Sequence, residues 1–168
     1  PRPLFAFEGN FVVAASAGTG KTYTLVGVLV HILLGASALG AGPSGRGIDP
    51  SRVVATTFSR KAAAEIRERL TAALEGLTAS GEGAYRSALL RAFEAHGAVV
   101  TPRELEKRAR AALERLSRAR IGTLHSFAQG LVRERALELS IAPGFELLSE
   151  DEAALQAEET TSSVRARQ

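Results

Sequence analysis

Three short runs of apolar and β-branched residues predict strands in this chain. Residues 11–15 form a continuous apolar run, which is typical of a strand buried on both faces. Residues 52–58 are rich in β-branched side chains, and residues 121–124 form a third, shorter candidate. Because stretches with helical periodicity separate these runs, the pattern favours an α/β fold with a parallel sheet.

Apolar positions three and four residues apart predict the helices. The clearest helix covers residues 61–74, where Ala63, Ile66, Leu70 and Leu74 fall on one face. A helix that begins at residue 101 has a Thr-Pro-x-Glu start, which suits an N-cap and first turn. That helix is predicted to run over residues 101–118. Further helices are predicted at residues 22–34, 84–95 and 126–139, and a last one starts after residue 149.

Stretches rich in glycine, serine and proline separate these elements. Residues 35–50 predict a flexible loop, and residues 76–83 predict a second break. The region from residue 76 to about 118 is longer than a usual connection between two strands, so we expect a helical insertion there.

Composition and charge exclude several classes of protein. The 168 residues suffice for one domain, and the absence of cysteine excludes disulfides and thiolate metal sites and fits the cytosol. The longest apolar stretch, residues 25–34, is too short to cross a bilayer, so no membrane partner is expected. The net charge of +3 allows nucleic-acid binding without arguing for it. Because the chain begins with Pro1 and lacks methionine, we expect an excised part of a longer protein.

Residues 15–22 carry the strongest chemical signal. Their sequence, ASAGTGKT, fits the phosphate-loop pattern GxxxxGK[ST] if alanine replaces the first glycine. Glycines at the fourth and sixth positions let the backbone N–H groups turn toward an anion, and the following helix adds its positive end. We expect Lys21 to reach the β- and γ-phosphates of ATP and the Thr22 hydroxyl to ligate Mg²⁺. The predicted nucleotide-binding residues are Ala15, Ser16, Ala17, Gly18, Thr19, Gly20, Lys21, Thr22 and Tyr23.

The alternative for this octapeptide is a glycine-rich turn with an accidental Lys-Thr pair. A pattern match needs a buried strand before it and a helix directly after it. The predicted strand at 11–15 and helix at 22–34 supply that context, so nucleotide binding is the favoured interpretation.

Three motifs in order resemble those of superfamily 1 DNA helicases of the UvrD/RecB type. The phosphate loop resembles the first motif, and Ser16 within it and Tyr23 directly after it are closer to the RecB and AddA branch. Residues 57–69, TFSRKAAAEIRER, resemble the second motif, TFTxxAAxEMxxR. Residues 122–127, GTLHSF, are similar to the TxH[GS]F segment that follows, so the resemblance covers nearly the whole chain.

The resemblance implies a particular fold and activity. Residues 1–168 would be part of helicase domain 1A, a P-loop NTPase (RecA-like) parallel sheet flanked by helices, incomplete and with a helical insertion. The next helical subdomain would start near residue 149. The complete protein would be an ATP-dependent DNA helicase that translocates on single-stranded DNA and unwinds duplex in recombination or repair. Other subunits of a helicase–nuclease complex are possible partners in that branch.

The resemblance also implies a path for single-stranded DNA. In the second motif, Thr57 and Ser59 offer hydroxyls to phosphates, and Phe58 offers a ring on which a base can stack. As a residue at a strand end, Phe58 is equally compatible with a core position, and both alternatives stay open. For Lys61, two roles also stay open: it neutralises a DNA phosphate, or it forms an ion pair with an acidic residue of its own helix. For Arg69 the ion pair within the helix is favoured.

The third motif places three further residues on the same path, namely Thr123, His125 and Ser126. A lone histidine near a strand end is more often structural, so the role of His125 rests on the resemblance. His31 and His96 are expected to be structural, and no histidine or cysteine stands at metal-ligand spacing.

Parts of a hydrolytic site are not recognisable in the chain. Hydrolysis needs a carboxylate pair on a second strand and arginines near the transferring phosphoryl group. Residues 145–148 lead into an acidic stretch, but Glu146 interrupts the apolar run, and Ser149 with Glu152 has the spacing of a capping box. We therefore expect this piece to bind nucleotide weakly and not to unwind DNA. A complete small P-loop kinase and a non-catalytic nucleotide-binding module remain as alternatives.

Overall fold

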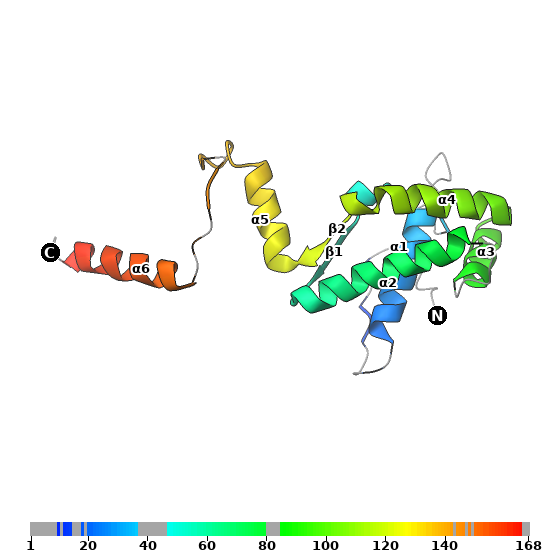
Figure 1. Ribbon diagram of the computed structural model, residues 1–168, viewed down its shortest axis with the longest axis horizontal. Coiled ribbons are helices and arrows are strands. Elements are labelled where there is room, and N and C mark those ends of the chain that lie inside the picture. Colours follow the sequence, from blue (N-terminus) through cyan, green and yellow to red (C-terminus); the bar gives the residue numbers. More distant parts are fainter. Residues whose placement is uncertain are drawn as a thin grey trace. The chain divides into compact units, whose positions relative to one another are not determined.

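The computed structural model describes residues 10, 12–14, 18, 20–36, 47–79, 85–142, 144–146, 148 and 150–165. They belong to two units, Pro1–Phe127 and Ala128–Gln168. The helices and strands in chain order are α1 (Lys21–Leu34), β1 (Val54–Thr57), α2 (Arg60–Thr78), α3 (Arg86–Ala95), α4 (Pro102–Arg115), β2 (Arg120–Thr123), α5 (Leu124–Glu134) and α6 (Glu150–Arg165) (Figure 1). Short 3-10 helices, Pro50–Arg52 and Leu116–Arg118, lead into the two strands.

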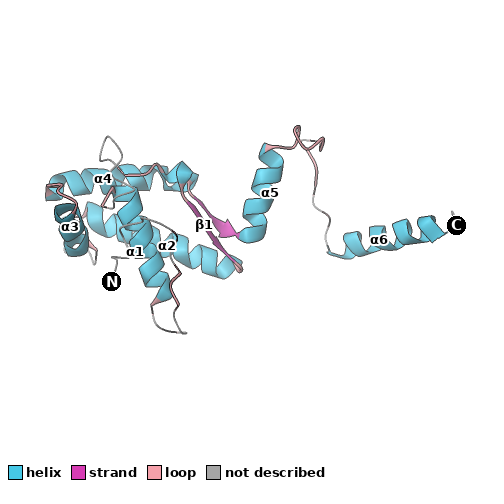
Figure 2. Cartoon of the chain, turned by 180° about the vertical axis from the view of Figure 1, so that it is seen from behind, coloured by secondary structure: helices cyan, strands magenta, loops and turns pink. Residues whose placement is uncertain are grey.

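The two strands lie side by side as a parallel pair (Figure 2). Val54 is opposite Arg120, and Thr57 is opposite Thr123. Helices α2, α3 and α4 form the connection between them, and the parallel pairing of these two strands is the one that the sequence predicts. Since paired parallel strands end at the same edge, α2 and α5 both begin at that edge.

The prediction of a strand at residues 11–15 is wrong for residues 12–14, which are the positions of this run that the structure describes. Residues 12–14 have no regular structure, and the side chains of Val12 and Val13 are 96% and 52% exposed. An apolar run becomes a central strand only where neighbouring strands take its backbone hydrogen bonds and other layers cover its faces. Within the described residues, β1 and β2 pair with each other and leave residues 12–14 without such a neighbour. Phe11 and Ala15 lie outside the described residues.

The end of α2 also differs from the prediction. The sequence predicts a break from residue 76, but the helix continues through Gly76 to Thr78. Leu74 and Leu77 are both fully buried, so packing of this last turn outweighs the cost of about 1 kcal/mol for a glycine inside a helix.

Helix α5 begins earlier and ends sooner than residues 126–139. The Ser126 backbone N–H donates to the Thr123 hydroxyl at 3.1 Å, and this cap starts the helix directly at the end of β2. Leu124 and His125 are therefore helical. The chain leaves the helix after Glu134 and continues as turns to residue 140.

The core of the first unit lies between α1, α2, α3 and α4. The apolar stripes that the sequence predicts on these helices face one another there. The largest fully buried side chains are Val26, Val30, Leu34, Leu70, Leu74, Leu77, Leu89, Phe93 and Leu105. No helix in the described ranges has the length and hydropathy needed to cross a membrane.

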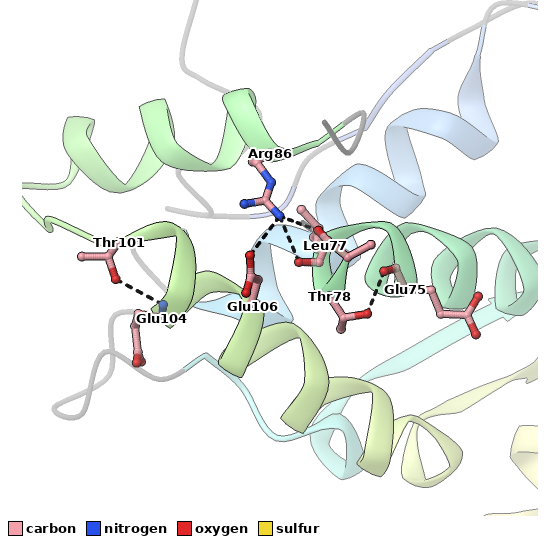
Figure 3. A network of polar contacts seen from close by, with 8 residues as sticks. Glu75, Leu77, Thr78, Arg86, Thr101, Glu104 and Glu106 are labelled. Atoms are coloured by element: carbon pink, nitrogen blue, oxygen red, sulfur yellow. Dashed lines mark hydrogen bonds and ion pairs between the residues drawn. The ribbon is translucent and has the colours of Figure 1, made fainter. Parts of the chain in front are cut away.

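Arg86 joins the inserted helices to the end of α2 (Figure 3). Its Nη2 atom donates to the carbonyl oxygens of Leu77 at 3.3 Å and Ala79 at 2.9 Å, and lies 3.6 Å from the Glu106 carboxylate of α4. A cation at a helix C-terminus satisfies unpaired carbonyls and opposes the negative end of the helix dipole. The start of α3 is thereby fixed against both α2 and α4.

The start of α4 follows the prediction. Thr101 is its N-cap and accepts from the Glu104 N–H at 3.2 Å, with Pro102 at the first helical position. One turn later, Arg108 pairs with Glu104 at 3.1 Å and donates to the Leu34 carbonyl at the end of α1, also at 3.1 Å. Arginines thus cap the C-termini of both α1 and α2.

His31 has the structural role expected for it. The ring is buried in α1, and its Nδ1 atom lies 2.7 Å from the Gly27 carbonyl oxygen, which can only accept a hydrogen. Burial lowers the pKa of the ring and the hydrogen bond to Gly27 partly opposes this, so the histidine is neutral in the folded chain.

Candidate functional site

The start of α1 has the backbone that the phosphate loop requires at the two glycines that are described. Gly18 and Gly20 have φ angles of +78° and +82°, in the left-handed region that favours glycine. A side chain added at Gly18 would meet no atom within 4 Å, so backbone conformation, not space, calls for glycine there. Gly20 is the N-cap of α1, and its carbonyl accepts from the Thr24 N–H at 2.8 Å. The loop positions Ala15, Ser16, Ala17 and Thr19 lie outside the described residues.

The first turn of α1 carries the remaining nucleotide candidates. Lys21 is exposed, Thr22 is half-buried and Tyr23 is 53% exposed. Neither a side-chain cap nor an acidic residue occupies this described end of the helix. The backbone N–H groups of a helix start, the positive end of its dipole and a lysine in the first turn together suit an anion such as a phosphate.

Phe58 follows β1 and points away from the core. Its side chain is 91% exposed, so within this chain it does not pack into the core at the strand end. The next residue, Ser59, is the N-cap of α2 and accepts from the Ala62 N–H at 3.1 Å. Thr57 is half-buried and Lys61 is exposed in the first turn of α2.

In the third motif, as in the second, a residue with a hydroxyl caps the helix that follows the strand. The Thr123 hydroxyl accepts from the Ser126 N–H, and the Ser126 hydroxyl donates to the Thr123 carbonyl at 2.8 Å. His125 is exposed beside them. The hydroxyls of Ser59, Thr123 and Ser126 therefore hold helix starts in place, a role that the sequence prediction did not include.

The structure brings the second and third motifs together at one edge of the sheet. Because Thr57 is paired with Thr123, the residues that follow each strand emerge side by side. The N-termini of α2 and α5 both lie at this edge, and each carries a partial positive charge. An exposed aromatic ring, a lysine and two helix N-termini together offer stacking and phosphate contacts to a single-stranded nucleic acid.

The last two arginines of the second motif have partners inside the protein. Arg69 pairs with Glu65 at 2.8 Å, which confirms the pairing favoured for it. Arg67 donates from Nη2 to the Ile121 carbonyl at 2.8 Å and so joins α2 to β2. That contact spans 54 residues along the chain, and no local sequence pattern indicates it.

Tyr85 is a neighbour of the nucleotide candidates that the sequence analysis missed. It precedes α3, and its ring stacks on Tyr23 with centroids 5.2 Å apart and planes inclined by 22°. It falls next to the stretch that the sequence predicts as a break, and nothing in the local pattern links it to α1.

Gly122 is required by the helix cap in the third motif. A Cβ atom added there would lie 2.7 Å from the Ser126 Oγ atom, which is too close for any real contact. We expect Gly122→Ala to destabilise the fold by about 1–3 kcal/mol, as overpacking does. Ser126→Ala removes the obstructing hydroxyl and should recover part of that loss. Thermal unfolding of the two single variants, the double variant and the parent measures this coupling. Strictly additive losses would contradict the close contact.

Comparison with known proteins defines the class of this chain. Residues 2–167 match the model of the UvrD/REP helicase N-terminal domain, and the chain belongs to that family. The parallel pair of strands within a helix-rich α/β unit is compatible with such a domain.

Among its relatives are proteins whose names describe them as one subunit of an ATP-dependent helicase/nuclease. The protein from Heliobacterium modesticaldum is 33% identical over 161 residues, which cover 96% of this chain and 9% of the relative. The protein from Anoxybacillus flavithermus is 33% identical over 156 residues, which cover 93% of this chain and 10% of the relative. The protein from Desulforamulus reducens is also 33% identical, over 148 residues, 88% of this chain and 10% of its own length. The chain thus spans about a tenth of the curated relatives it matches.

Proposed function

We propose that this chain is the ATP-binding part of an ATP-dependent DNA helicase that translocates on single-stranded DNA and unwinds duplex in recombination or repair. The observation that carries the proposal is the exposed ring of Phe58 at a sheet edge where two helix N-termini meet. An aromatic ring this exposed, beside a lysine and two helix N-termini, has the groups that stack on a base and contact its phosphate. Single-stranded DNA offers both the base and the phosphate.

The nucleotide lies at the start of α1 in this proposal, within a P-loop, RecA-like domain 1A. Lys21 contacts the β- and γ-phosphates, Thr22 ligates Mg²⁺, and the backbone of residues 15–20 surrounds the phosphates. The positive φ angles of Gly18 and Gly20 and the uncapped start of α1 support this arrangement. The carboxylates and arginines needed for hydrolysis come from elsewhere in the complete protein.

Single-stranded DNA lies along the edge formed by the second and third motifs. Phe58 stacks on a base, and Lys61 and the first N–H groups of α2 contact a phosphate. The hydroxyls of Ser59, Thr123 and Ser126 hold the helix starts at this edge, and Thr57 and the exposed His125 lie on the same path. Stacking tolerates every base, so binding is expected to be independent of sequence.

Further subunits of a helicase–nuclease complex are proposed as partners, on the strength of the relatives' names. The absence of cysteine is compatible with work on DNA in the cytosol.

The test is ATP hydrolysis by the complete protein with and without single-stranded oligonucleotides. We expect marked stimulation by oligo-dT and by a mixed-sequence strand of equal length, because the DNA contacts do not read bases. ATP consumption that needs a small-molecule acceptor and ignores DNA would instead identify a kinase. Nucleotide binding without turnover under either condition would identify a non-catalytic module.

A further inference from the structure

A small hollow of about 340 Å³ lies beside the first turn of α1. It is lined by Tyr23 and Tyr85 and by Arg69 of α2. Its floor comes from α2, where Ala72, Ala73 and Gly76 keep the side chains small. The two tyrosines are therefore not buried within the core of the first unit.

The two rings hold each other. Besides the stack at 5.2 Å, the Tyr85 hydroxyl donates to the Tyr23 carbonyl oxygen at 3.4 Å. Burial raises the pKa of the Tyr85 phenol and Tyr23 raises it further, while the nearby Arg69 charge partly opposes both effects. Gly27, one turn further along α1, lies beside the Tyr85 ring: a Cβ atom there would make an ordinary contact of 3.4 Å with Cε1.

The position of Tyr85 is itself fixed by its neighbour in the chain. Arg86 follows it directly and binds two carbonyls at the end of α2 and a carboxylate of α4. The contacts of Arg86 thus fix the start of α3, and with it the position of the Tyr85 ring beside Tyr23. Tyr23 in turn follows Lys21 and Thr22, so the same turn of α1 carries the stacked ring and the proposed phosphate ligands.

We propose that Tyr85 is a positioning residue of the nucleotide site, which holds Tyr23 and the first turn of α1 in the conformation that receives ATP. The proposal rests on the proposed function, because it needs a nucleotide at Lys21 and Thr22. It makes nucleotide affinity depend on the inserted helices between β1 and β2. Tyr85 itself does not touch the reacting phosphoryl group.

The test compares Tyr85→Ala and Tyr85→Phe in the complete protein. Aromatic stacking of this kind corresponds to about twofold to tenfold in an equilibrium constant. We expect Tyr85→Ala to raise the KM for ATP and the Kd for ADP by about that factor, with kcat unchanged. Tyr85→Phe keeps the ring and lacks only the long 3.4 Å hydrogen bond, so it should restore both constants to nearly the parent values.

Leu90→Ala is the matched control. Leu90 is half-buried on α3 and packs against the core, so its truncation loosens the same helix without removing the stack. Unchanged constants in Tyr85→Ala, or an equal rise in Leu90→Ala, would overturn the positioning role while leaving the proposed function intact. A parent protein that neither hydrolyses ATP nor binds ADP would overturn both. ADP titration by calorimetry gives an answer even where turnover is slow.

Discussion

Replacement of Lys21 by alanine should abolish ATP turnover by the complete protein. Lys21 is the first residue of α1, directly after the left-handed Gly20, at a helix start with no side-chain cap. In phosphoryl transfer the protein contributes mainly positioning and charge stabilisation, so loss of this cation removes stabilisation where charge develops. We expect a decrease in kcat of at least about 100-fold to 1,000-fold, the range known for loss of one such donor. A steady-state assay of phosphate release measures it.

Lys107→Ala is the control for this experiment, because Lys107 is another exposed lysine, on α4. It should leave turnover unchanged. The fold should survive Lys21→Ala, since the side chain is exposed and contributes nothing to the core. Full turnover by a folded Lys21→Ala protein would remove the phosphate loop from the mechanism, and with it the helicase proposal.

Local signals in the sequence predicted most of the helices. The cap at Thr101 accepts from the Glu104 N–H as predicted, and the buried stripe of α2 contains Ile66 and Leu70 as expected. These features depend on contacts within one or two turns, which a sequence displays directly. The phosphate-loop glycines belong to the same class, because their φ angles follow from a pattern eight residues long.

The features that the sequence did not predict depend on contacts between residues that are far apart along the chain. Whether residues 12–14 form a strand depends on what lies beside them, and hydrophobicity alone does not supply that neighbour. The Tyr23–Tyr85 stack and the Arg67–Ile121 hydrogen bond join residues 62 and 54 positions apart. The sequence has no periodicity at such separations, so the neighbours of the nucleotide site emerge only from the fold.

Helix α2 touches both candidate sites. Its first turn, after Ser59, lies at the sheet edge, and Ala72 and Gly76 lie beside Tyr23. At 1.5 Å per residue, the axial distance from Ser59 to Ala72 is about 20 Å. In the proposed arrangement, this one helix therefore contacts both the DNA edge and the neighbours of the nucleotide site.

Replacement of Phe58 by alanine should weaken binding of single-stranded DNA by the complete protein. The sequence left this ring between core and surface, and within this chain it is 91% exposed. Truncation of so exposed a side chain leaves no cavity, so stability should be unaffected and any change in affinity belongs to the DNA contact. Loss of one stacked base corresponds to about 1–3 kcal/mol, a factor of roughly 5 to 150 in Kd. Fluorescence anisotropy with a labelled oligo-dT measures it.

Two further variants separate stacking from charge. Val99→Ala truncates another exposed apolar side chain, 97% exposed between α3 and α4, and should leave the affinity unchanged. Lys61→Ala should reduce the dependence of log Kd on log salt by about 0.7, the value for one phosphate of a single strand. Phe58→Ala should lower affinity while leaving that slope as it is, because a stacked base releases no counterion. A changed slope in Phe58→Ala would mean that the ring acts by holding the first turn of α2, whereas unaltered affinity and slope would place the DNA elsewhere on the domain.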